Sequence, residues 1–451
     1  MSGAIGFCDP AACASAGCDA VVCVGKGIAS NQRIFDRSAH VIPGGVNSSI
    51  RAFKAVGGTP YIVSRANGAY VWDVEGRQHI DLVQSYGAVI LGHAHPAIVE
   101  AISTAATSGT SYGAPTTREM KLAEAISERV SSCEMVRFMN SGTEATSTAV
   151  RLARGATGRD KIVTFHGNFH GATDALLAAG GSGVATLGLP GTAGVPKEAV
   201  ANTWVLPYNE VPVLENDVAA VIVEPVAANM GLVPPAPGFL EGLRSECNRV
   251  GALLIFDEVI TGFRLGLGGA QAKVDVRPDL TCFGKVIGGG LPIGAVGGRR
   301  DIMVNMSPLG AVFHAGTLAG NPIATAAGLA VLNELTADSY MELSARARRL
   351  SAVLRDACAE SQVTAQFPVF GTLVGMHFGP ALNGRAPSNF EEAKTTDEKL
   401  FARVFHAALS HGVALAPGAY EALFVGLAHT DDVIDQIGER MMTALAAVAR
   451  S

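Results

Sequence analysis

The clearest pattern in the sequence is a set of short, continuous apolar runs separated by segments with helical spacing. Residues 219–223 and 252–256 are apolar at every position and have the length of strands. Such runs are typical of parallel strands that are buried on both faces. Residues 280–283 form a third candidate strand, and residues 120–130 carry apolar positions at i, i+3 and i+4, which predicts a helix. Strands that alternate with helices predict an α/β fold with a doubly wound, mostly parallel sheet.

A second α/β unit is expected near the end of the chain. The sequence is helical after residue 321, and residues 374–378 and 413–415 are strand-like. Near the start, residues 70–73 and 79–82 flank a turn and predict a hairpin. We therefore expect a disordered leader (residues 1–29), a segment that joins a smaller α/β domain (30–75), a large domain (76–325) and the rest of the smaller domain (326–451).

Composition and charge exclude several classes of function. Hydrophobic residues make up 48% of the 451 residues and charged residues 16%, so a large core can form. A formal net charge of -6 does not supply the clustered positive charge that binds nucleic acids or anionic membranes. No apolar run reaches the roughly 20 residues that span a bilayer, and the N-terminus lacks the features of a secretory signal. We expect a cytoplasmic protein without nucleic-acid or membrane partners.

The eight cysteines fall into two groups. Four of them recur at every fifth position: Cys8, Cys13, Cys18 and Cys23. This spacing differs from the close pairs that are typical of zinc sites, and no histidine lies near, so we expect a chance pattern and no metal site. The others stand in apolar contexts and are expected in the core: Cys133, Cys247, Cys282 and Cys358.

Two charged residues follow the apolar runs and predict cofactor chemistry. Asp257 comes directly after residues 252–256, at the expected carboxyl end of a parallel strand, where open α/β sheets bind ligands. Lys285 lies 28 positions later, after residues 280–283 and before Gly288-Gly289-Gly290. Each alone has an ordinary structural interpretation. Together they suit pyridoxal 5′-phosphate (PLP), whose aldehyde forms an imine with a lysine and whose protonated ring nitrogen pairs with an aspartate.

A phosphate site and an aromatic neighbour are also predicted. Ser141-Gly142-Thr143 stands between a strand-like run and a helix-like run, and the N–H groups at such a helix start favour an anion. Because Ser and Thr are also common helix caps, this turn alone is weak support. Phe169 follows another strand-like run, residues 161–165, and is either a core residue or an aromatic that stacks on a cofactor.

These segments together resemble class III aminotransferases of PLP-dependent fold type I, and within that class the glutamate-1-semialdehyde 2,1-aminomutase family. The resemblance covers roughly residues 30–450. The segments that carry it are 43–46, 51–53, 92–96, 141–145, 169–171, 181–190, 257–264, 284–290 and 315–322. The resemblance implies a large domain with a mostly parallel, seven-stranded type of sheet and a smaller α/β domain. It also implies that residues 182–190 form a loop that gates the active site.

The resemblance assigns roles residue by residue. Lys285, Asp257 and Glu421 are the implied catalytic residues. The implied cofactor-binding set is Ser141, Gly142, Thr143, Phe169, His170, Asn229, Asp257, Val259, Lys285 and, from a partner subunit, Thr317. The implied substrate-binding set is Ser48, Arg51, Tyr86, Ser182 and Glu421.

The implied reaction moves an amino group within one molecule. Glutamate-1-semialdehyde would receive nitrogen from the amine form of the cofactor (PMP) and would leave as 5-aminolevulinate, a tetrapyrrole precursor, in a homodimer with active sites at the interface. Four residues depart from the family's pattern in the substrate pocket: Tyr86, Phe169, Phe313 and His314. They leave open the alternative that the protein is a class III aminotransferase or aminomutase that acts on a different amino acid. A non-enzymatic binding protein is a third alternative, which the intact Lys285 and Asp257 oppose.

Overall fold

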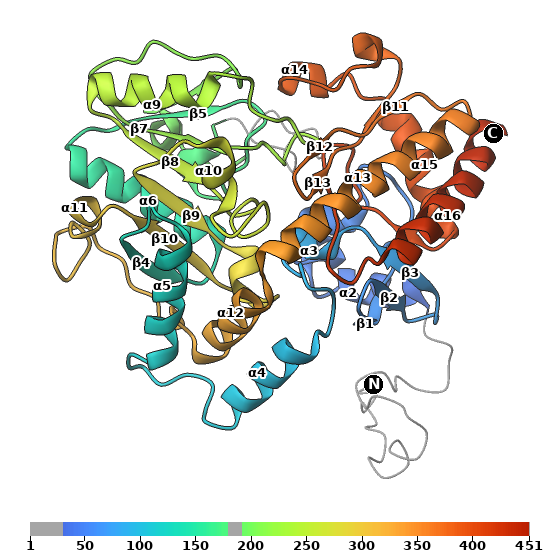
Figure 1. Ribbon diagram of the computed structural model, residues 1–451, viewed down its shortest axis with the longest axis horizontal. Helices are drawn as coiled ribbons and strands as arrows, with labels where there is room; N and C mark the ends of the chain where they lie inside the picture. Colours follow the sequence, from blue (N-terminus) through green and yellow to red (C-terminus); the bar gives the residue numbers. More distant parts are fainter. Residues whose placement is uncertain (1–29, 179–191, 451) are drawn as a thin grey trace.

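The computed structural model describes residues 30–178 and 192–450, and its largest element is a seven-stranded sheet (Figure 1). The strand order is β4-β10-β9-β8-β7-β5-β6. Neighbouring strands run parallel, except that β10 is antiparallel to both β4 and β9. The strands are β4 (Met135–Met139), β5 (Lys161–Phe165), β6 (Thr203–Leu206), β7 (Val218–Val223), β8 (Leu253–Asp257), β9 (Leu280–Phe283) and β10 (Gly294–Gly298). The predicted mostly parallel α/β sheet is therefore confirmed.

Alternate residues of β7 pack against helices on opposite faces of this sheet. Val221 and Val223 share a core with α9, whereas Ala220 and Ile222 share a core with α6. Every residue of β7 is buried, because both faces of the strand are covered. The helices of this part are α4 (Pro96–Ala106), α5 (Thr117–Arg129), α6 (Gly142–Thr157), α8 (Lys197–Val200), α9 (Phe239–Val250), α10 (Gly269–Val274), α11 (Arg300–Met303) and α12 (Pro322–Glu334), with the short 3-10 helices η3 (Asp174–Leu176) and η4 (Lys285–Gly288).

The N-terminal strands belong to the same sheet as a C-terminal strand. The order of this four-stranded sheet is β1-β2-β3-β15, and β15 runs parallel to β3. Strands β2 and β3 form the predicted hairpin. Figure 1 shows β1, β2 and β3 in blue beside the red C-terminal helix α16. The N-terminal elements are α2 (Asn31–Ala39), η1 (Pro43–Gly45), η2 (Ser49–Ala52), β1 (Val63–Asn67), β2 (Tyr70–Asp73), β3 (Gln78–Asp81) and α3 (Gln84–Gly87).

The C-terminal part confirms a second α/β arrangement but corrects one strand. The single strand expected over residues 374–378 is two short strands, β13 (Leu373–Val374) and β14 (His377–Phe378), which belong to different sheets. The strand is interrupted at Gly375. A Cβ there would collide with the carbonyl oxygen of Gly231, so the close approach of the two backbone segments requires glycine. The remaining elements are α13 (Ala337–Glu360), β11 (Ala365–Gln366), β12 (Val369–Phe370), η5 (Ala381–Gly384), α14 (Phe390–Ala393), α15 (Glu398–Ser410), β15 (Val413–Ala414), β16 (Leu423–Phe424) and α16 (Asp431–Arg450).

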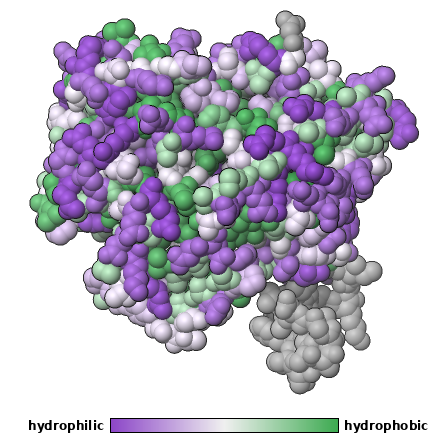
Figure 2. Space-filling view, in the orientation of Figure 1, coloured by the Kyte–Doolittle hydropathy of each residue, from purple (hydrophilic) through white to green (hydrophobic). Residues whose placement is uncertain are grey.

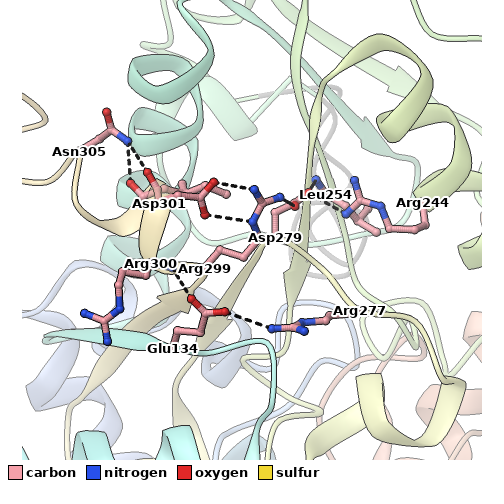
Figure 3. Close-up of polar contacts among 10 residues, drawn as sticks. Glu134, Arg244, Leu254, Arg277, Asp279, Arg299, Arg300, Asp301 and Asn305 are labelled. Atoms are coloured by element: carbon pink, nitrogen blue, oxygen red, sulfur yellow. Dashed lines mark hydrogen bonds and ion pairs between the residues drawn. The ribbon is translucent and has the colours of Figure 1, made fainter.

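An ionic network fixes the amino-terminal edge of the large sheet (Figure 3). Asp279, which is buried at the start of β9, accepts hydrogen bonds from Arg244 of α9 at 2.7 Å, from Arg299 after β10 at 2.8 Å and from the Leu254 N–H of β8 at 2.8 Å. Arg299 also pairs with Asp301, to which it donates through Nε and Nη2. One carboxylate therefore joins a helix and three strands at the edge opposite the one where β9 leads into Lys285.

Surface and core agree with the expectations from composition. Figure 2 shows a face on which hydrophilic residues predominate and apolar residues form scattered patches. The four cysteines predicted in the core are buried free thiols. In the described ranges no helix is both long enough and apolar enough to cross a membrane. The four N-terminal cysteines and the leader lie outside the described residues.

Candidate active site

The predicted phosphate turn lies between strand β4 and helix α6. Ser141 caps the helix, and its side chain accepts a hydrogen bond from the Glu144 N–H at 3.1 Å. The following N–H groups of the first turn have no partner within the helix, so they can bind an anion. Gly142 has no room for a side chain, because a Cβ there would lie 2.9 Å from a methyl carbon of Val259. The turn therefore presents backbone donors, the Thr143 hydroxyl and a floor made by Val259.

Asp257 and His170 form a buried pair beside this turn. Asp257 ends strand β8, and its carboxylate accepts from the Val259 N–H at 3.1 Å and contacts His170 Nδ1 at 2.7 Å. Because a carboxylate only accepts, the hydrogen bond places the proton on Nδ1 of His170. The carbonyl of His170 in turn accepts from the Thr146 hydroxyl of helix α6 at 2.6 Å. The carboxylate is therefore held from two sides, as the partner of a positively charged ring nitrogen must be.

Lys285 enters the same cavity from the loop after β9. Its backbone φ of 47° lies in the left-handed region, which is unusual for a residue with a side chain. Burial lowers the pKa of the Lys285 amine, and the negative charges of Asp257, Glu224 and Glu421 oppose this shift. A lowered pKa leaves more of the amine unprotonated near neutral pH, which is the form that attacks a carbonyl group.

A cavity of about 240 Å³ brings these residues together. Nine of the predicted site residues line it: Ser141, Gly142, Thr143, Phe169, His170, Asn229, Asp257, Val259 and Lys285. It is also lined by Thr146, Gly171, Glu224, Ile260 and Thr261. The side-chain donors, the anion-binding turn, the buried carboxylate and the lysine fit the phosphate, the ring nitrogen and the aldehyde of PLP.

Glu224 is a residue of this cavity that the sequence analysis missed. It follows strand β7 directly, and its buried carboxylate accepts from the Phe169 N–H at 2.7 Å, the Ala228 N–H at 2.9 Å and the Asn229 side chain at 2.9 Å. Burial raises the pKa of Glu224, and the electrostatic interaction with His170 is the main influence that lowers it. The same signal that identified Asp257, a carboxylate directly after a buried strand, would have found it.

Three of the predicted substrate residues, Arg51, Tyr86 and Glu421, lie within electrostatic reach of one another, and none of them lines this cavity. Burial raises the pKa of Tyr86, and the next influences are the negative charge of Glu421, which raises it, and the positive charge of Arg51, which lowers it. Glu421 is buried, whereas Arg51 is exposed on η2. Ser48, which precedes η2, is exposed, and no contact places it in the cavity. Ser182 lies outside the described residues.

Thr317 does not reach the cavity of its own chain. It is exposed in the loop before α12, next to Ala315 and Gly316, which line a separate cavity of about 420 Å³. Phe313 and His314 lie in the same loop, and Phe313 is 68% exposed. None of these three residues lines the cavity that contains Lys285.

Comparison with known proteins agrees with this site. The profile of the family described as Aminotransferase class-III matches residues 53–445. A glutamate-1-semialdehyde 2,1-aminomutase from Bordetella avium (strain 197N) is 50% identical over 424 residues, which cover 92% of this chain and 98% of that protein.

Solved structures show the same fold. An omega-transaminase from Sphaerobacter thermophilus has a TM-score of 0.85 at 30% identity and covers 94% of this chain and 99% of its own. A glutamate-1-semialdehyde aminomutase from Pseudomonas aeruginosa PAO1 has a TM-score of 0.81 at 28% identity and covers 93% and 94%, and a lysine-to-alanine variant of it was solved in complex with PMP. The chain belongs to the class III aminotransferases, PLP-dependent enzymes of fold type I, and within them it is similar to glutamate-1-semialdehyde 2,1-aminomutase.

Proposed function

We propose that the protein is an aminomutase that converts glutamate-1-semialdehyde into 5-aminolevulinate for tetrapyrrole synthesis. The observation that carries this proposal is the 50% identity along nearly the whole length of the Bordetella avium aminomutase. The cavity supports it, because it holds Lys285 together with the residues expected to bind PLP.

Different residues around the cavity would bind different groups of the cofactor. Ser141, Gly142 and Thr143 would bind the phosphate through backbone and hydroxyl donors. Asp257, fixed by His170, would keep the ring nitrogen protonated. When bound, the cofactor supplies an electrophilic carbon and a ring that withdraws electrons.

Further residues would enclose the ring and its polar edge. Phe169 and Val259 would pack on the ring, and Asn229 would lie near its hydroxyl group. The carboxylate of Glu224 accepts hydrogen bonds from both the Phe169 N–H and the Asn229 side chain, so it would fix the positions of these two residues relative to each other.

Lys285 and the substrate residues would direct the proton transfers. The lysine amine, whose pKa is lowered by burial, can take a proton from a substrate carbon and return it to another. Arg51 offers a planar guanidinium and Ser48 a hydroxyl to a substrate carboxylate. Tyr86 and Glu421 would line the substrate side, and Glu421 would distinguish amino-bearing from carbonyl-bearing forms by its charge. Ser182 would join them from the loop of residues 182–190.

A second candidate is an aminotransferase that uses a separate amino donor. The observation that favours it is that an omega-transaminase and a β-phenylalanine aminotransferase from Variovorax paradoxus match the fold at 30% and 33% identity. The deciding experiment incubates the purified, PMP-loaded protein with glutamate-1-semialdehyde and no other amino donor. Catalytic formation of 5-aminolevulinate supports the aminomutase. Turnover that appears only when an external amino donor is added refutes it.

We also propose a homodimer in the cytoplasm. Thr317 is exposed and lies away from its own cavity, and the neighbouring Leu318 is 53% exposed, which suits a loop that serves a partner's site. The buried free thiols suit a reducing compartment. Subunit mixing tests the shared site: Lys285→Ala and Thr317→Val chains should together recover activity that neither shows alone, because one site of a mixed dimer contains both native residues. No recovery after verified subunit exchange would contradict it.

A further inference from the structure

Arg264 is a buried cation to which the sequence analysis assigned no role. Its side chain has no exposed surface, and burial lowers its pKa to about 10. Nη1 donates to the carbonyl of Val425 and Nη2 to the carbonyl of Gly87, each at 2.7 Å. Within the described residues its Nε has no hydrogen-bond partner. Removing a guanidinium from water costs free energy, and hydrogen bonds to two neutral carbonyls offset only part of this cost. The burial of Arg264 therefore suggests a functional role.

One of the two carbonyls ends an unusual turn. Gln84, Ser85 and Tyr86 have φ values of 46°, 51° and 54°, and Gly87 has a φ of 96°. Successive left-handed residues are unfavourable for L-amino acids, so a turn of this kind needs support from its surroundings. Arg264 holds the end of this turn, one residue from Tyr86.

The other carbonyl belongs to the segment that carries Glu421. This segment runs through β16 to Val425, and the Phe424 N–H donates to the carbonyl of Leu82 at 3.0 Å. The Phe424 ring lies 5.6 Å from the guanidinium and packs against Gly87, where a Cβ would lie 2.7 Å from a ring carbon. Arg264 therefore bridges two segments that come from distant parts of the chain and contact each other here.

The segments joined in this way carry charges that act on one another. The charge of Glu421 raises the pKa of Tyr86, so the two side chains lie within electrostatic reach. Both Glu421 and Arg264 also influence the Lys285 amine, and the positive charge of Arg264 lowers its pKa. Arg264 lies in the segment that follows Asp257 and strand β8, and its charge reaches both the lysine and the segments that carry Tyr86 and Glu421.

We propose that Arg264 is a positioning residue whose guanidinium fixes the Tyr86 turn to the Glu421 segment and so sets the substrate side of the active site. This inference rests on the proposed function, in which Tyr86 and Glu421 contact the substrate. Two outer nitrogens on one rigid plane are needed to bind both carbonyls at once, and a lysine cannot reproduce this fork.

Arg346 provides a matched control. It is also a buried arginine that donates to a backbone carbonyl of the same stretch, that of Leu427, at 2.6 Å. Unlike Arg264, it forms an ion pair with Glu342, and it is not among the main charges that shift the pKa of Lys285. A loss of stability alone should therefore look the same in both positions, whereas an effect on the site should appear only at Arg264.

The experiment compares Arg264→Met, Arg264→Lys and Arg346→Met. Three quantities are measured: the thermal midpoint, KM and kcat for glutamate-1-semialdehyde, and the pH midpoint at which the apoenzyme captures PLP, followed by absorbance. Both Arg264 variants should raise KM by about tenfold or more, the size expected for a lost charged hydrogen bond. Arg264→Met should also move the pH midpoint upward, and Arg264→Lys should restore it because the positive charge returns. Arg346→Met should lower only the thermal midpoint.

Equal behaviour of the Arg264 and Arg346 variants, with KM and the pH midpoint at their wild-type values, would overturn the inference. If Arg264→Met does not fold, Arg264→Lys decides, since a wild-type KM in that variant refutes the need for the fork. The pH midpoint of capture does not involve substrate. Failure of the wild type to convert glutamate-1-semialdehyde would therefore refute the proposed function, whereas an unmoved pH midpoint in Arg264→Met would refute the influence of Arg264 on the site.

Discussion

Replacing Gly171 by alanine tests whether the phosphate turn depends on close backbone contact. Gly171 has a φ of 83°, and a Cβ there would lie 2.7 Å from the Cα of Thr143. Because that atom belongs to the backbone of helix α6, it cannot rotate away as a flexible side chain would. The added methyl group must push either Thr143 or His170 out of place.

A second glycine separates the two parts of this effect. Gly76 has a φ of 82°, and a Cβ there would have no neighbour within 4 Å. Gly76→Ala should therefore cost only the left-handed strain, roughly 1–2 kcal/mol, less about 0.4–1 kcal/mol from a more restricted unfolded chain. Gly171→Ala adds overpacking of about 1–3 kcal/mol. We expect a loss in the free energy of unfolding of about 1 kcal/mol for Gly76→Ala and about 2–4 kcal/mol for Gly171→Ala.

Urea unfolding of the apoenzymes measures the stabilities, and titration with PLP measures the affinity. Only Gly171→Ala should weaken cofactor binding, by about tenfold or more, because a displaced Thr143 loses a charge-assisted hydrogen bond to the phosphate. Gly76→Ala should bind PLP as the wild type does. Suppose that the two variants lost the same stability and both kept the wild-type affinity for PLP. The close contact between Gly171 and Thr143 would then not support the phosphate turn.

Three further predictions concern the cavity. Lys285→Ala should abolish turnover but leave a folded protein that binds PLP without a covalent link, and borohydride should fix the cofactor of the wild type to Lys285; a label found on Lys273 by peptide mapping would contradict this. Asp257→Asn should lower kcat by orders of magnitude with a small change in the thermal midpoint, since a neutral amide does not stabilise a pyridinium. Near-normal rates would show that Asp257 is not the partner of the ring nitrogen. Because burial lowers the pKa of Lys285 from 10.5, PLP capture by the apoenzyme should rise with pH and level off below that value; a rise that parallels imine formation by N-acetyl-lysine would show that Lys285 is an ordinary amine.

The apolar pattern predicted Asp257 and Lys285, because strand ends are visible in it, whereas His170, Asn229 and Val259 were implied only by the family resemblance. Asp257 and Lys285 each follow a buried run, and the parallel sheet brings the ends of such runs to one edge. The same rule applies to Glu224 after β7, so missing it reflected incomplete use of the pattern. By contrast, the break at Gly375 depends on the approach of Gly231, which lies more than a hundred residues away and leaves no local signal.

The substrate side shows why some functional contacts escape a sequence pattern altogether. Arg264 binds carbonyl groups that lie 177 and 161 residues away along the chain, and every residue type has such a carbonyl. A sequence motif can therefore identify the arginine but not the carbonyl groups to which it donates hydrogen bonds. The left-handed turn at Tyr86 is equally hidden, because Gln84, Ser85 and Tyr86 are not residues that favour a positive φ. Cofactor chemistry requires particular side chains at strand ends, whereas the shape of the substrate side depends on backbone held by distant side chains. In the role that we propose for Arg264, its replacement should alter substrate binding while the residues predicted to bind the cofactor stay the same.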